Sequence, residues 1–447
     1  MDKQKLYESA PSWLQNIAVN VEGEIICKRR YNKHFHEALR RFESHNYLPE
    51  EELKRFLLEV KDVKAYNNTF TLDVIEALKG VTSDVYEIIA KFPIIGKEIV
   101  KEHIEDYYNQ GYAGKLFTMR TSGTTGSGLA FPYPVEFENK QWAIWWRFRE
   151  SLGIQFRTWC GWFGGKRLIS PQNNKPPYWR VNTPGKQVMY SSYHLTKDTV
   201  RQFYDDLKSR NLEWLHGYPS HIAKLSALIL EVGLEPLNGV RWVTTGAEGL
   251  IGNQIRLIEK AFPNAIIRQH YGQNEGVAIL NQDKNGEWYV EDDFSYVEFI
   301  PVVKGGNLCR IVGTGFFNSA FPLIRYDTGD LATVERGSDG RIVRILSIDG
   351  RTSNTVKQPG GHEITEAALS IVLHDFDSIK EAQFHQVAPD SVVLWVVKGK
   401  DYSPKDEENL MVSLKRSFDE KMKVSIKYVD AVERTNTGKL RLVITES

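Results

Sequence analysis

The hydrophobic and polar positions of the 447-residue chain change their pattern twice along its length. In residues 1–110, apolar side chains recur at helical spacing, most clearly in Glu37–Val63, where Pro49 and the glutamates after it mark the start of a second helix. Further on, the polar run Thr82–Asp84 is suited to cap a helix over Val85–Lys91. The first part of the chain is therefore predicted to be mostly helical.

From about residue 110 to 350, short apolar strands alternate with helices, which favours a parallel sheet with helices on its faces. The predicted strands are Glu213–Tyr218, Val240–Thr245 and Ala265–His270, with helices over 220–232 and up to Ala261. In such sheets, ligands bind outside the carboxyl ends of the strands. Beyond residue 285 the predicted strands come without long helices, which suits an antiparallel β-subdomain, and they are Trp288–Ile300, Leu308–Val312, Leu331–Val334 and Ile342–Ile348.

A turn at Asp349–Ser353 separates this part from a small α+β segment at the C-terminal end. The predicted elements of that segment are helices Glu366–His374 and Lys405–Lys423 and strands Ala382–Val387, Ser391–Lys398 and Ser425–Asp430. We therefore expect an α/β protein whose large N-terminal domain combines parallel sheets, flanking helices and an antiparallel β-subdomain, followed by a small mobile α+β domain. The expected division is a helical part over 1–110, a core with a nucleotide site over 111–350, and a C-terminal lid over 351–447.

Composition removes several classes of partner. The chain carries 57 Lys+Arg and 57 Asp+Glu residues, so it offers no electrostatic reason to bind nucleic acid or an anionic membrane. Its three cysteines are scattered, which fits neither a disulfide framework nor a zinc site and suits a reducing compartment. No secretion signal or run of about 20 apolar residues is visible, so we expect a soluble, cytoplasmic protein without a membrane span. The pattern does not indicate an oligomeric state.

The most distinctive loop consists of Thr121, Ser122, Gly123, Thr124, Thr125, Gly126, Ser127 and Gly128. Its glycines let backbone amides approach an anion closely, and its hydroxyls add donors, so the loop suits a triphosphate. A Walker A motif is excluded because no lysine follows Gly126, and the glycine spacing does not fit a dinucleotide fingerprint. Most loops of this composition are simply loops, so a nucleotide site needs a lysine and carboxylates from elsewhere.

Three further segments supply those groups. Tyr271 ends a predicted strand and could stack on a base, and Glu275 could hold Mg²⁺, which prefers carboxylate and phosphate oxygens. Asp330 follows a turn and could accept hydrogen bonds from ribose hydroxyls. Lys439 lies on a glycine-containing loop and could enter an active site when the small domain closes. Taken singly, each has an ordinary reading: a solvated loop glutamate, a turn aspartate and a solubilising surface lysine.

Taken together and in order, these segments resemble the adenylate-forming superfamily of acyl-CoA synthetases, peptide-synthetase adenylation domains and luciferases. The sequence resembles the branch that contains phenylacetate–CoA ligase and related capsule-biosynthesis proteins. The resemblance spans about 95–447 and is carried by Thr121–Gly126, Gly246–Glu248, Tyr271–Glu275, Leu323–Asp330, Gly350–Arg351 and Thr437–Lys439.

The resemblance implies a role for each segment. Lys439 would bridge the carboxylate and the α-phosphate during adenylation, and Glu275 would hold Mg²⁺. The hydroxyl loop would wrap the phosphates, Asp330 would bind the ribose, and Arg351 would support the ribose or a phosphate. The implied nucleotide-binding set is Thr121, Ser122, Gly123, Thr124, Thr125, Gly126, Gly246, Ala247, Glu248, Tyr271, Gly272, Gln273, Asn274, Asp330 and Arg351. Candidates for the substrate pocket are Trp145, Trp162, Tyr218 and Tyr271, for which plain core packing is the competing reading.

The sequence departs from the family pattern at two places near the small domain. Ser353 stands where many members have an aspartate or lysine hinge, which puts the domain rotation needed for thiolation in doubt. Glu433 and Arg434 stand where many members have a proline before the lysine loop.

The leading hypothesis is therefore an ATP- and Mg²⁺-dependent ligase that converts a carboxylate to an acyl-adenylate and passes the acyl group to an acceptor. An amine or hydroxyl in surface-polysaccharide biosynthesis is the favoured acceptor, and coenzyme A, as in an aryl- or acyl-CoA ligase, is the close alternative. A second class is a non-catalytic nucleotide-binding scaffold on the same fold. A hydrolase finds little support, because no Gly-x-Ser-x-Gly elbow is present. The acid itself is not indicated.

Overall fold

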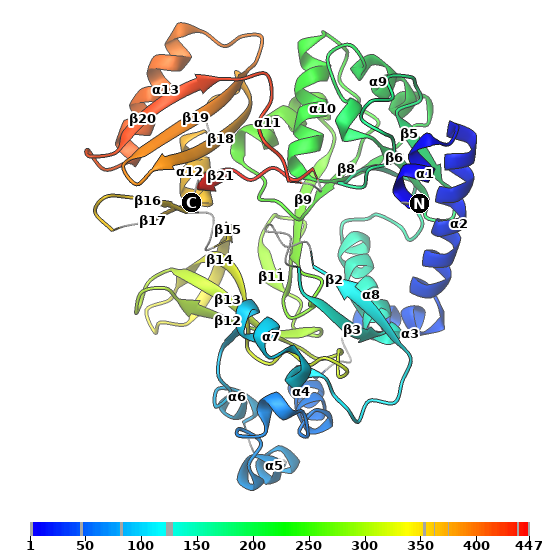
Figure 1. Ribbon diagram of the computed structural model, residues 1–447, viewed down its shortest axis with the longest axis vertical. Coiled ribbons are helices and arrows are strands. Elements are labelled where there is room, and N and C mark those ends of the chain that lie inside the picture. Colours follow the sequence, from blue (N-terminus) through cyan, green and yellow to red (C-terminus); the bar gives the residue numbers. More distant parts are fainter. Residues whose placement is uncertain are drawn as a thin grey trace. The chain divides into compact units, whose positions relative to one another are not determined.

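The computed structural model describes residues 3–44, 48–80, 84–121, 128–351, 355–361, 363–373, 375–435 and 438–445. The chain forms two compact units (Figure 1). Unit 1 contains Met1–Glu24, Arg157–Gln269 and Asp349–Ser447, and unit 2 contains Ile25–Phe156 and His270–Ile348. The chain passes from one unit to the other within helix α2 (Ser12–Arg30) and within strands β9 (Ile266–Gly272) and β15 (Ile342–Arg351). Each unit is described by itself below.

The larger sheet of unit 1 is mainly parallel, as the alternation of strands and helices predicts. Its strand order is β9-β8-β7-β4-β6-β5, and only the β5–β6 pair is antiparallel. Its strands are β4 (Cys160–Phe163), β5 (Trp179–Asn182), β6 (Gln187–Tyr190), β7 (Trp214–Gly217) and β8 (Trp242–Thr245). The accompanying helices are α1 (Lys3–Ser9), η3 (Ser192–His194), α9 (Val200–Ser209), α10 (Pro219–Glu231) and α11 (Gly252–Ala261). The three strands and two helices predicted between 213 and 270 are confirmed.

The register of this sheet brings three strand ends level with one another. Gly217 pairs with Phe163 of β4 on one side and with Thr245 of β8 on the other. At Gly217 the neighbouring backbone is so close that an added Cβ would lie 2.2 Å from the carbonyl oxygen of Phe163. Glycine at this position therefore allows β4 and β7 to end side by side, and the loops that follow the strands begin at one edge.

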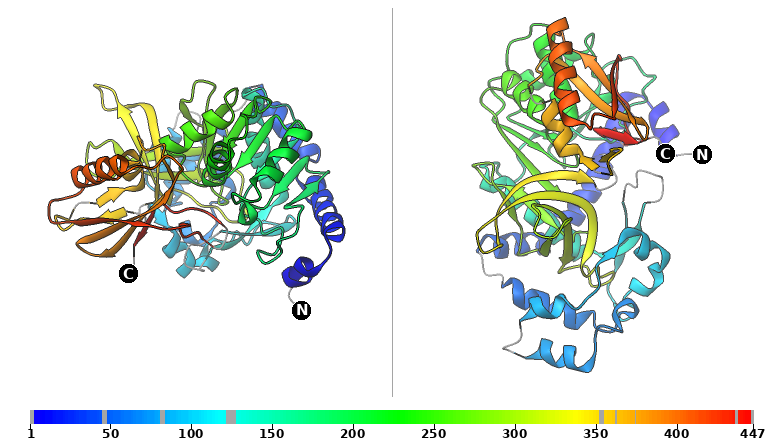
Figure 2. Two further views of the ribbon diagram at one scale, coloured as in Figure 1. Left: turned by 90° about the horizontal axis from the view of Figure 1, so that it is seen from above. Right: turned by 90° about the vertical axis from the view of Figure 1, so that its left-hand side faces the viewer.

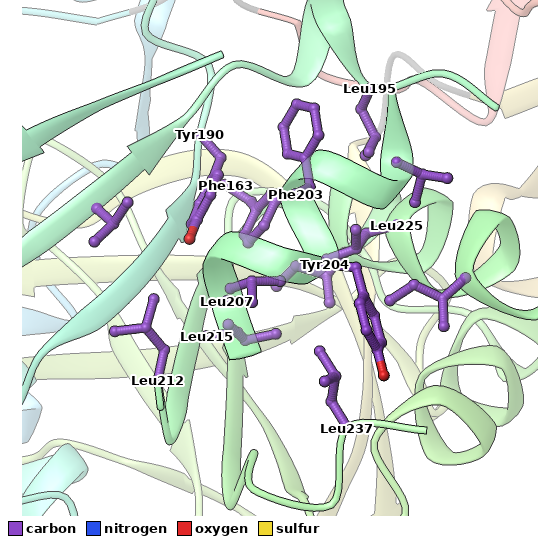
Figure 3. Packing of buried hydrophobic residues seen from close by; sticks show 14 of the residues in the cluster. Phe163, Tyr190, Leu195, Phe203, Tyr204, Leu207, Leu212, Leu215, Leu225 and Leu237 are labelled. Carbon is purple, nitrogen blue, oxygen red and sulfur yellow. The ribbon is translucent and has the colours of Figure 1, made fainter. Parts of the chain in front are cut away.

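One hydrophobic cluster holds the sheet of unit 1 to its helices (Figure 3). Phe163 and Tyr190 stack at 4.8 Å between ring centroids, and Phe203 of α9 packs 5.8 Å from Tyr190. Leu215 of β7 and Leu225 of α10 are fully buried in the same cluster. Continuous apolar strands of this kind are expected where a parallel sheet is covered on both faces.

The C-terminal part of unit 1 is a separate small α+β sheet, with strand order β20-β19-β18-β21. Helices α12 and α13 lie on one face of this sheet (Figure 2). Leu369 of α12 and Leu410 and Leu414 of α13 belong to the same buried cluster as Phe384, Leu394 and Val396 of the strands. Its elements are β16 (Thr355–Lys357), β17 (Glu363–Thr365), α12 (Glu366–Val372), β18 (Ile379–Ala388), β19 (Ser391–Lys398), α13 (Pro404–Ser417), β20 (Lys423–Tyr428) and β21 (Val443–Thr445).

One predicted helix in this part is too long. The helix predicted over Lys405–Lys423 ends at Ser417, because Phe418 turns to extended backbone and inserts its ring into the small core. At its other end, Ser403 and Asp406 form a reciprocal capping box that fixes the start. The next strand then begins at Lys423, two residues before the predicted position.

The N-terminal segment of unit 2 is helical, as predicted. Pro49 is the first residue of α4, and Asn32 caps α3 by accepting from two backbone amides. Asp84 caps α6, whereas Thr82 and Ser83 lie outside the described residues. The elements are α3 (Lys33–Glu43), α4 (Pro49–Glu59), η1 (Lys64–Tyr66), α5 (Leu72–Lys79), α6 (Val85–Ile89), β1 (Ile95–Gly96), α7 (Lys97–Glu102) and η2 (Ile104–Tyr107).

The rest of unit 2 is a hairpin, one long helix and an antiparallel sheet. The hairpin is β2 (Leu116–Arg120) and β3 (Ala130–Pro134), and the helix is α8 (Val135–Ser151). The sheet order is β12-β13-β14-β15-β11-β10-β9, and its strands besides β9 and β15 are β10 (Ile279–Gln282), β11 (Trp288–Val290), β12 (Ser295–Pro301), β13 (Leu308–Gly315) and β14 (Tyr326–Arg336). The antiparallel β-subdomain predicted beyond residue 285 is thus confirmed.

The single strand predicted over Trp288–Ile300 is wrong, because β11 and β12 are separated by a turn. The backbone amide of Phe294 donates to the carbonyl of Glu291, which reverses the chain there. Glu291 and Asp293 in this turn both pair with Arg147 of α8. Buried carboxylates need such partners, and the hydrophobic pattern of the strand itself does not reveal them.

In the parts of the chain that the structure covers, no helix is long and apolar enough to cross a membrane. The division of the chain into domains over 1–110, 111–350 and 351–447 stays a prediction.

The close approach at Gly217 generates a test of the fold. Gly217→Ala should lower the free energy of unfolding by about 1–3 kcal/mol, because the new methyl group would meet the backbone of β4. Gly239→Ala is the matched control, since its Cβ would lie 3.5 Å from its nearest neighbour, an ordinary contact. Denaturant unfolding of both variants checks this, and equal stability of the two would contradict the close-packing argument.

Candidate functional site

Thr121 and Leu129 flank the hydroxyl-rich loop and continue the β2–β3 hairpin. The amide of Thr121 donates to the carbonyl of Leu129 at 2.9 Å, and the amide of Leu129 donates to the hydroxyl oxygen of Thr121 at 2.8 Å. The Thr121 hydroxyl is therefore fixed by its own hairpin. The other predicted phosphate-binding residues of this loop, Ser122, Gly123, Thr124, Thr125 and Gly126, lie outside the described residues.

Within unit 2 the structure brings Tyr271 and Asp330 together, although the chain separates them widely. The Tyr271 hydroxyl donates to Oδ2 of Asp330 at 2.8 Å and accepts from Nε2 of Gln273 at 2.9 Å. Burial, reinforced by the Asp330 charge, raises the pKa of Tyr271 well above its ordinary value. The phenol therefore stays protonated and keeps the Asp330 carboxylate, which is only 8% exposed, in one orientation.

The turn predicted before Asp330 is wrong, because the residue lies within β14, next to an irregularity in the pairing of β13 and β14 that fixes the backbone there. Gly329 has a φ of 73°, a region that glycine adopts without strain, and its amide donates to Oδ1 of Asp327 at 2.9 Å. The Asp330 amide donates to the Thr328 hydroxyl at 3.1 Å, and that hydroxyl donates to the carbonyl of Ile311. These hydrogen bonds fix the backbone from which the Asp330 side chain extends.

The segment after β9 lies against the hairpin and α8. Asn274 donates to the carbonyl of Arg120 at 3.1 Å, and Gln141 of α8 donates to the carbonyl of Gln273 at the same distance. Glu275 follows in a partly buried position and is succeeded by Gly276, whose φ is 64°. A glutamate carboxylate has the chemistry that Mg²⁺ prefers, and the role of Glu275 in holding it stays a prediction.

Unit 2 also contains a small cavity of about 170 Å³ between α8, β2 and the end of β9. Its walls include the rings of Trp142 and Trp145, and Trp145 lies 4.7 Å from the His270 ring. The lining residues are Arg30, Met119, Glu138, Gln141, Trp142, Trp145, Gly272, Gln273 and Asn274. The predicted pocket residue Trp145 is thus part of a cavity, whereas Trp162 and Tyr218 belong to unit 1.

The charges in this cavity are paired with each other. Glu138 is 2% exposed and accepts from Arg29 at 2.6 Å and from Arg30 at 2.8 Å. The Arg30 guanidinium also lies 4.3 Å from the ring centroid of Trp142. Sequence reasoning missed these residues, and their only signal was the tryptophan-rich helical pattern of α8.

In unit 1, the Gly246–Glu248 segment directly follows β8, at the carboxyl edge of the parallel sheet. The Gly246 amide faces the carbonyl of Gly217 at 3.4 Å. Ala247 has a φ of 69°, which is strained for a residue with a Cβ and is typical of functional turns. The turn points Glu248 back toward α10, where Oε2 accepts from the Ser220 amide at 3.2 Å.

The predicted catalytic lysine lies on a short hairpin in the same unit. The amide of Thr435 donates to the carbonyl of Lys439 at 3.0 Å, the amide of Lys439 donates to the Thr435 hydroxyl at 3.1 Å, and Gly438 has a φ of 79°. The lysine ammonium lies 5.6 Å from the ring centroid of Tyr218. The next amide, that of Leu440, donates to Oε1 of Glu248 at 2.6 Å.

Two further side chains contact this hairpin, and neither was predicted for the site. Nη1 of Arg434 donates to the Ser220 hydroxyl at 2.9 Å and to the carbonyl of Gly438 at 3.1 Å, and Nη2 pairs with Glu381. The ring of His221 lies between two carbonyls, with Nε2 3.0 Å from Gly438 and Nδ1 3.2 Å from Phe163. Burial and the nearby Arg434 lower the pKa of His221 to about 3, so the ring is neutral.

Arg351 ends β15 as an exposed residue of unit 1, and its support of a ribose or phosphate stays a prediction. Ser353, the predicted departure at the hinge, lies outside the described residues. The structure thus collects Gly246, Ala247, Glu248, Tyr218 and Lys439 in unit 1, and Thr121, Tyr271, Gln273, Asn274 and Asp330 in unit 2.

Two solved structures that resemble the chain are ligases. A 2-hydroxyisobutyryl-CoA ligase, in the postadenylation state in complex with 2-HIB-AMP, is similar with a TM-score of 0.64 and 17% identity over 89% of each chain. The anthranilate CoA ligase AuaEII, in complex with anthranoyl-AMP, is similar with a TM-score of 0.52 and 13% identity over 74% of this chain and 67% of the other. The chain therefore has the fold of the adenylate-forming ligases, as the sequence motifs predicted.

Sequence comparison gives a more particular likeness. Residues 356–446 match the family described as the CapK C-terminal domain. Over 450 aligned residues the chain is 26% identical to Protein CapK of Staphylococcus aureus, and the alignment covers 98% of each chain.

The environment of His221 generates a test. Between about pH 6.5 and pH 3, this histidine binds a proton in the unfolded chain but not in the folded chain. The neutral, buried His221 therefore contributes fully to the free energy of unfolding above about pH 6.5, and this contribution is lost progressively as the pH falls toward about 3. An NMR titration of the His221 ring should show no protonation down to about pH 4. A midpoint near 6.5 would contradict the burial of the ring beside Arg434.

Proposed function

We propose that the protein is an ATP-dependent ligase that activates a carboxylic acid as its acyl-adenylate. The observation that carries this proposal is the docking of the Lys439 hairpin on Glu248, which places a lysine beside the carboxyl edge of the parallel sheet. Ligands bind at this edge in open α/β sheets. The likeness of the fold to ligases that hold acyl-AMP supports the same reaction class.

In the proposed reaction, a carboxylate oxygen of the acid attacks the α-phosphorus of ATP. An acyl–phosphate bond forms, the bond between the α-phosphorus and its bridging oxygen breaks, and pyrophosphate leaves with that oxygen. The Lys439 ammonium would stabilise the negative charge that develops on the reacting oxygens, which is the largest single contribution in many such sites. An acceptor then attacks the acyl carbon, and AMP leaves.

The residues of unit 2 fit the nucleotide in this proposal. Asp330, oriented by Tyr271, would accept from the ribose hydroxyls, since an ionised carboxylate can take two donors. The Thr121 hairpin would present its loop to the phosphates. Glu275 would hold Mg²⁺ together with phosphate oxygens, because that ion is commonly bound by one or two carboxylates plus substrate phosphates.

The cavity of unit 2 supports a small acid. A cavity of about 150 Å³ holds a benzene-sized molecule, and this one measures about 170 Å³. The two tryptophan rings offer apolar walls, and Gln141 and Asn274 offer amide groups. We propose an acid with a single ring or a short branched chain, because a long acyl chain would exceed the volume.

The proposed acceptor is an amine or hydroxyl of the kind used in surface-polysaccharide biosynthesis. The full-length similarity to Protein CapK supports this choice over coenzyme A. Coenzyme A is the alternative, since the ligases with the same fold are named as CoA ligases.

The reaction class is tested by carboxylate-dependent exchange of pyrophosphate into ATP. We expect exchange with a pool of small aryl or hydroxy acids, and a loss of about 100-fold or more in kcat for Lys439→Ala with ATP binding nearly unchanged. Lys400→Ala, which removes an exposed lysine from the turn after β19, is the matched control. ATP binding without exchange for any acid would contradict a ligase and favour a nucleotide-binding scaffold.

The cavity is tested by enlarging it. Trp145→Ala should shift the preference toward bulkier acids, raising the ratio of kcat/KM for a two-ring acid over a one-ring acid by about 10-fold or more, because removing the indole opens the wall. Trp13→Ala removes an exposed tryptophan and should leave the ratio unchanged. An unchanged ratio in Trp145→Ala would remove this cavity from the acid site.

A further inference from the structure

Helix α2 carries its large apolar side chains on the face that points to solvent. Trp13, Ile17, Val21 and Ile25 follow one another at every fourth position, and Leu14 lies beside them. All five side chains belong to residues that are 42–64% exposed. Single exposed apolar residues are common, but a contiguous set of this kind marks an interaction site. We name these five residues the α2 apolar row.

The opposite face of α2 is polar and is tied to the edge strand β5. The Val181 amide donates to Oδ1 of Asn16 at 3.0 Å, and Nδ2 of Asn20 donates to the Val181 carbonyl at 2.7 Å. Oδ1 of Asn20 also accepts from the Thr183 amide at 3.0 Å. Figure 1 shows α2 along this edge of the parallel sheet, next to β5. The two asparagines thus satisfy backbone groups that an edge strand otherwise leaves unpaired.

Close packing and a buried cation fix the rotation of α2 about its own axis. Gly23 lies so near β5 that an added Cβ would be 2.1 Å from Oδ1 of Asn182. Nε of the buried Arg180 donates to Oε1 of Gln15 at 2.8 Å. Turning the apolar row inward would break these contacts and leave buried polar groups without partners, which is costly. The row faces outward because the polar face of the helix is needed on β5.

The geometry of the row suits a second copy of the same helix. Helices commonly pack the ridge formed by every fourth residue of one helix into the groove beside the same kind of ridge on the other. The row contains one such ridge, and Leu14 and Ala18 line the groove next to it. In an antiparallel pair with a two-fold axis between Ile17 and Val21, Ile17 of one copy meets Val21 of the other.

The exposed area is sufficient for such a dimer. At about 100–200 Å² for a large apolar side chain, five that are roughly half exposed leave about 400 Å² uncovered. Two copies would bury about 800 Å² of apolar surface, which corresponds to about 1,200 Å² of total interface at the apolar share of about 65% that is typical of homodimers. Because this area is at the lower end for stable interfaces, the expected dimer is weak.

The charges beside the row favour a protein partner over a lipid surface. Glu22 and Glu24 are exposed along its side, and Lys28 is exposed one turn further on. Helices that lie on membranes carry mainly lysine and arginine around the apolar face, which anionic lipids attract. The two carboxylates would be repelled by such a surface.

We propose that the α2 apolar row is a dimer interface, formed by antiparallel packing of α2 against α2 of a second copy of this chain. The proposal does not depend on the reaction that the protein catalyses. In the dimer, α2 is covered on both faces: β5 satisfies its polar face, and the second copy covers its apolar face.

Sedimentation velocity of the full-length protein over a concentration series tests this interface. The wild type should change from monomer to dimer with a Kd of about 1–100 μM, as suits a small interface. Ile17→Glu and Val21→Lys should each raise the Kd by about 10-fold or more, because each places a charge at the centre of the apolar contact. Leu72→Glu, at an exposed leucine of α5, is the matched control and should leave the Kd unchanged.

A mixture of the two variants tests the antiparallel arrangement. Ile17→Glu mixed with Val21→Lys should recover dimers, because the two-fold axis places the new carboxylate opposite the new ammonium. The melting temperature of each variant should match that of the wild type, since the replaced side chains are exposed.

A wild type that stays monomeric at every concentration would overturn the proposal, as would an unchanged Kd in both variants. Failure of the mixture to dimerise would overturn the antiparallel arrangement. Flotation of a monomeric wild type with phosphatidylcholine–phosphatidylglycerol vesicles, abolished by Ile17→Glu, would instead assign the row to a lipid surface.

Discussion

The carboxylate of Glu248 is the interaction on which the arrangement of unit 1 depends. A strained turn at Ala247 sends it back over the edge of the parallel sheet, where it accepts one amide from α10 and one from the lysine hairpin. The start of a helix and the neighbour of the lysine are thereby tied to the same group. Because both partners are backbone amides, the chain path itself is fixed, and the lysine side chain is left to point at Tyr218.

In unit 2, a side chain rather than backbone amides orients a buried carboxylate. Asp330 must present a carboxylate in one orientation, and it does so by accepting from a tyrosine hydroxyl that burial keeps protonated. The side-chain amide of Gln273 donates to the same hydroxyl, and the backbone at Gly329 is held by the carboxylate of Asp327. Such networks favour a single geometry, since a buried polar group without its partner is costly.

The charged residues around the cavity near α8 are paired with one another. Glu138 is buried and accepts from both Arg29 and Arg30, so its negative charge has two cationic partners. Arg30 then covers Trp142 with the face of its guanidinium. The other lining groups are aromatic rings, side-chain amides, Met119 and Gly272.

Hydrophobic periodicity alone predicted the helical start, the parallel sheet, the antiparallel subdomain and the small α+β sheet, because each depends on spacing that a neighbouring residue can reveal. The motifs also placed Gly246–Glu248, Tyr271 and Lys439 at strand ends or turns, as the structure has them, whereas Asp330 lies within β14. Periodicity failed where distant groups intervene: Arg147 breaks the strand predicted after Trp288, and Phe418 ends a helix early to fill a core. The Tyr271–Asp330 pair, the Arg30–Glu138 cavity wall and the docking of Leu440 on Glu248 depend on long-range contacts, which only the folded chain brings within hydrogen-bonding distance.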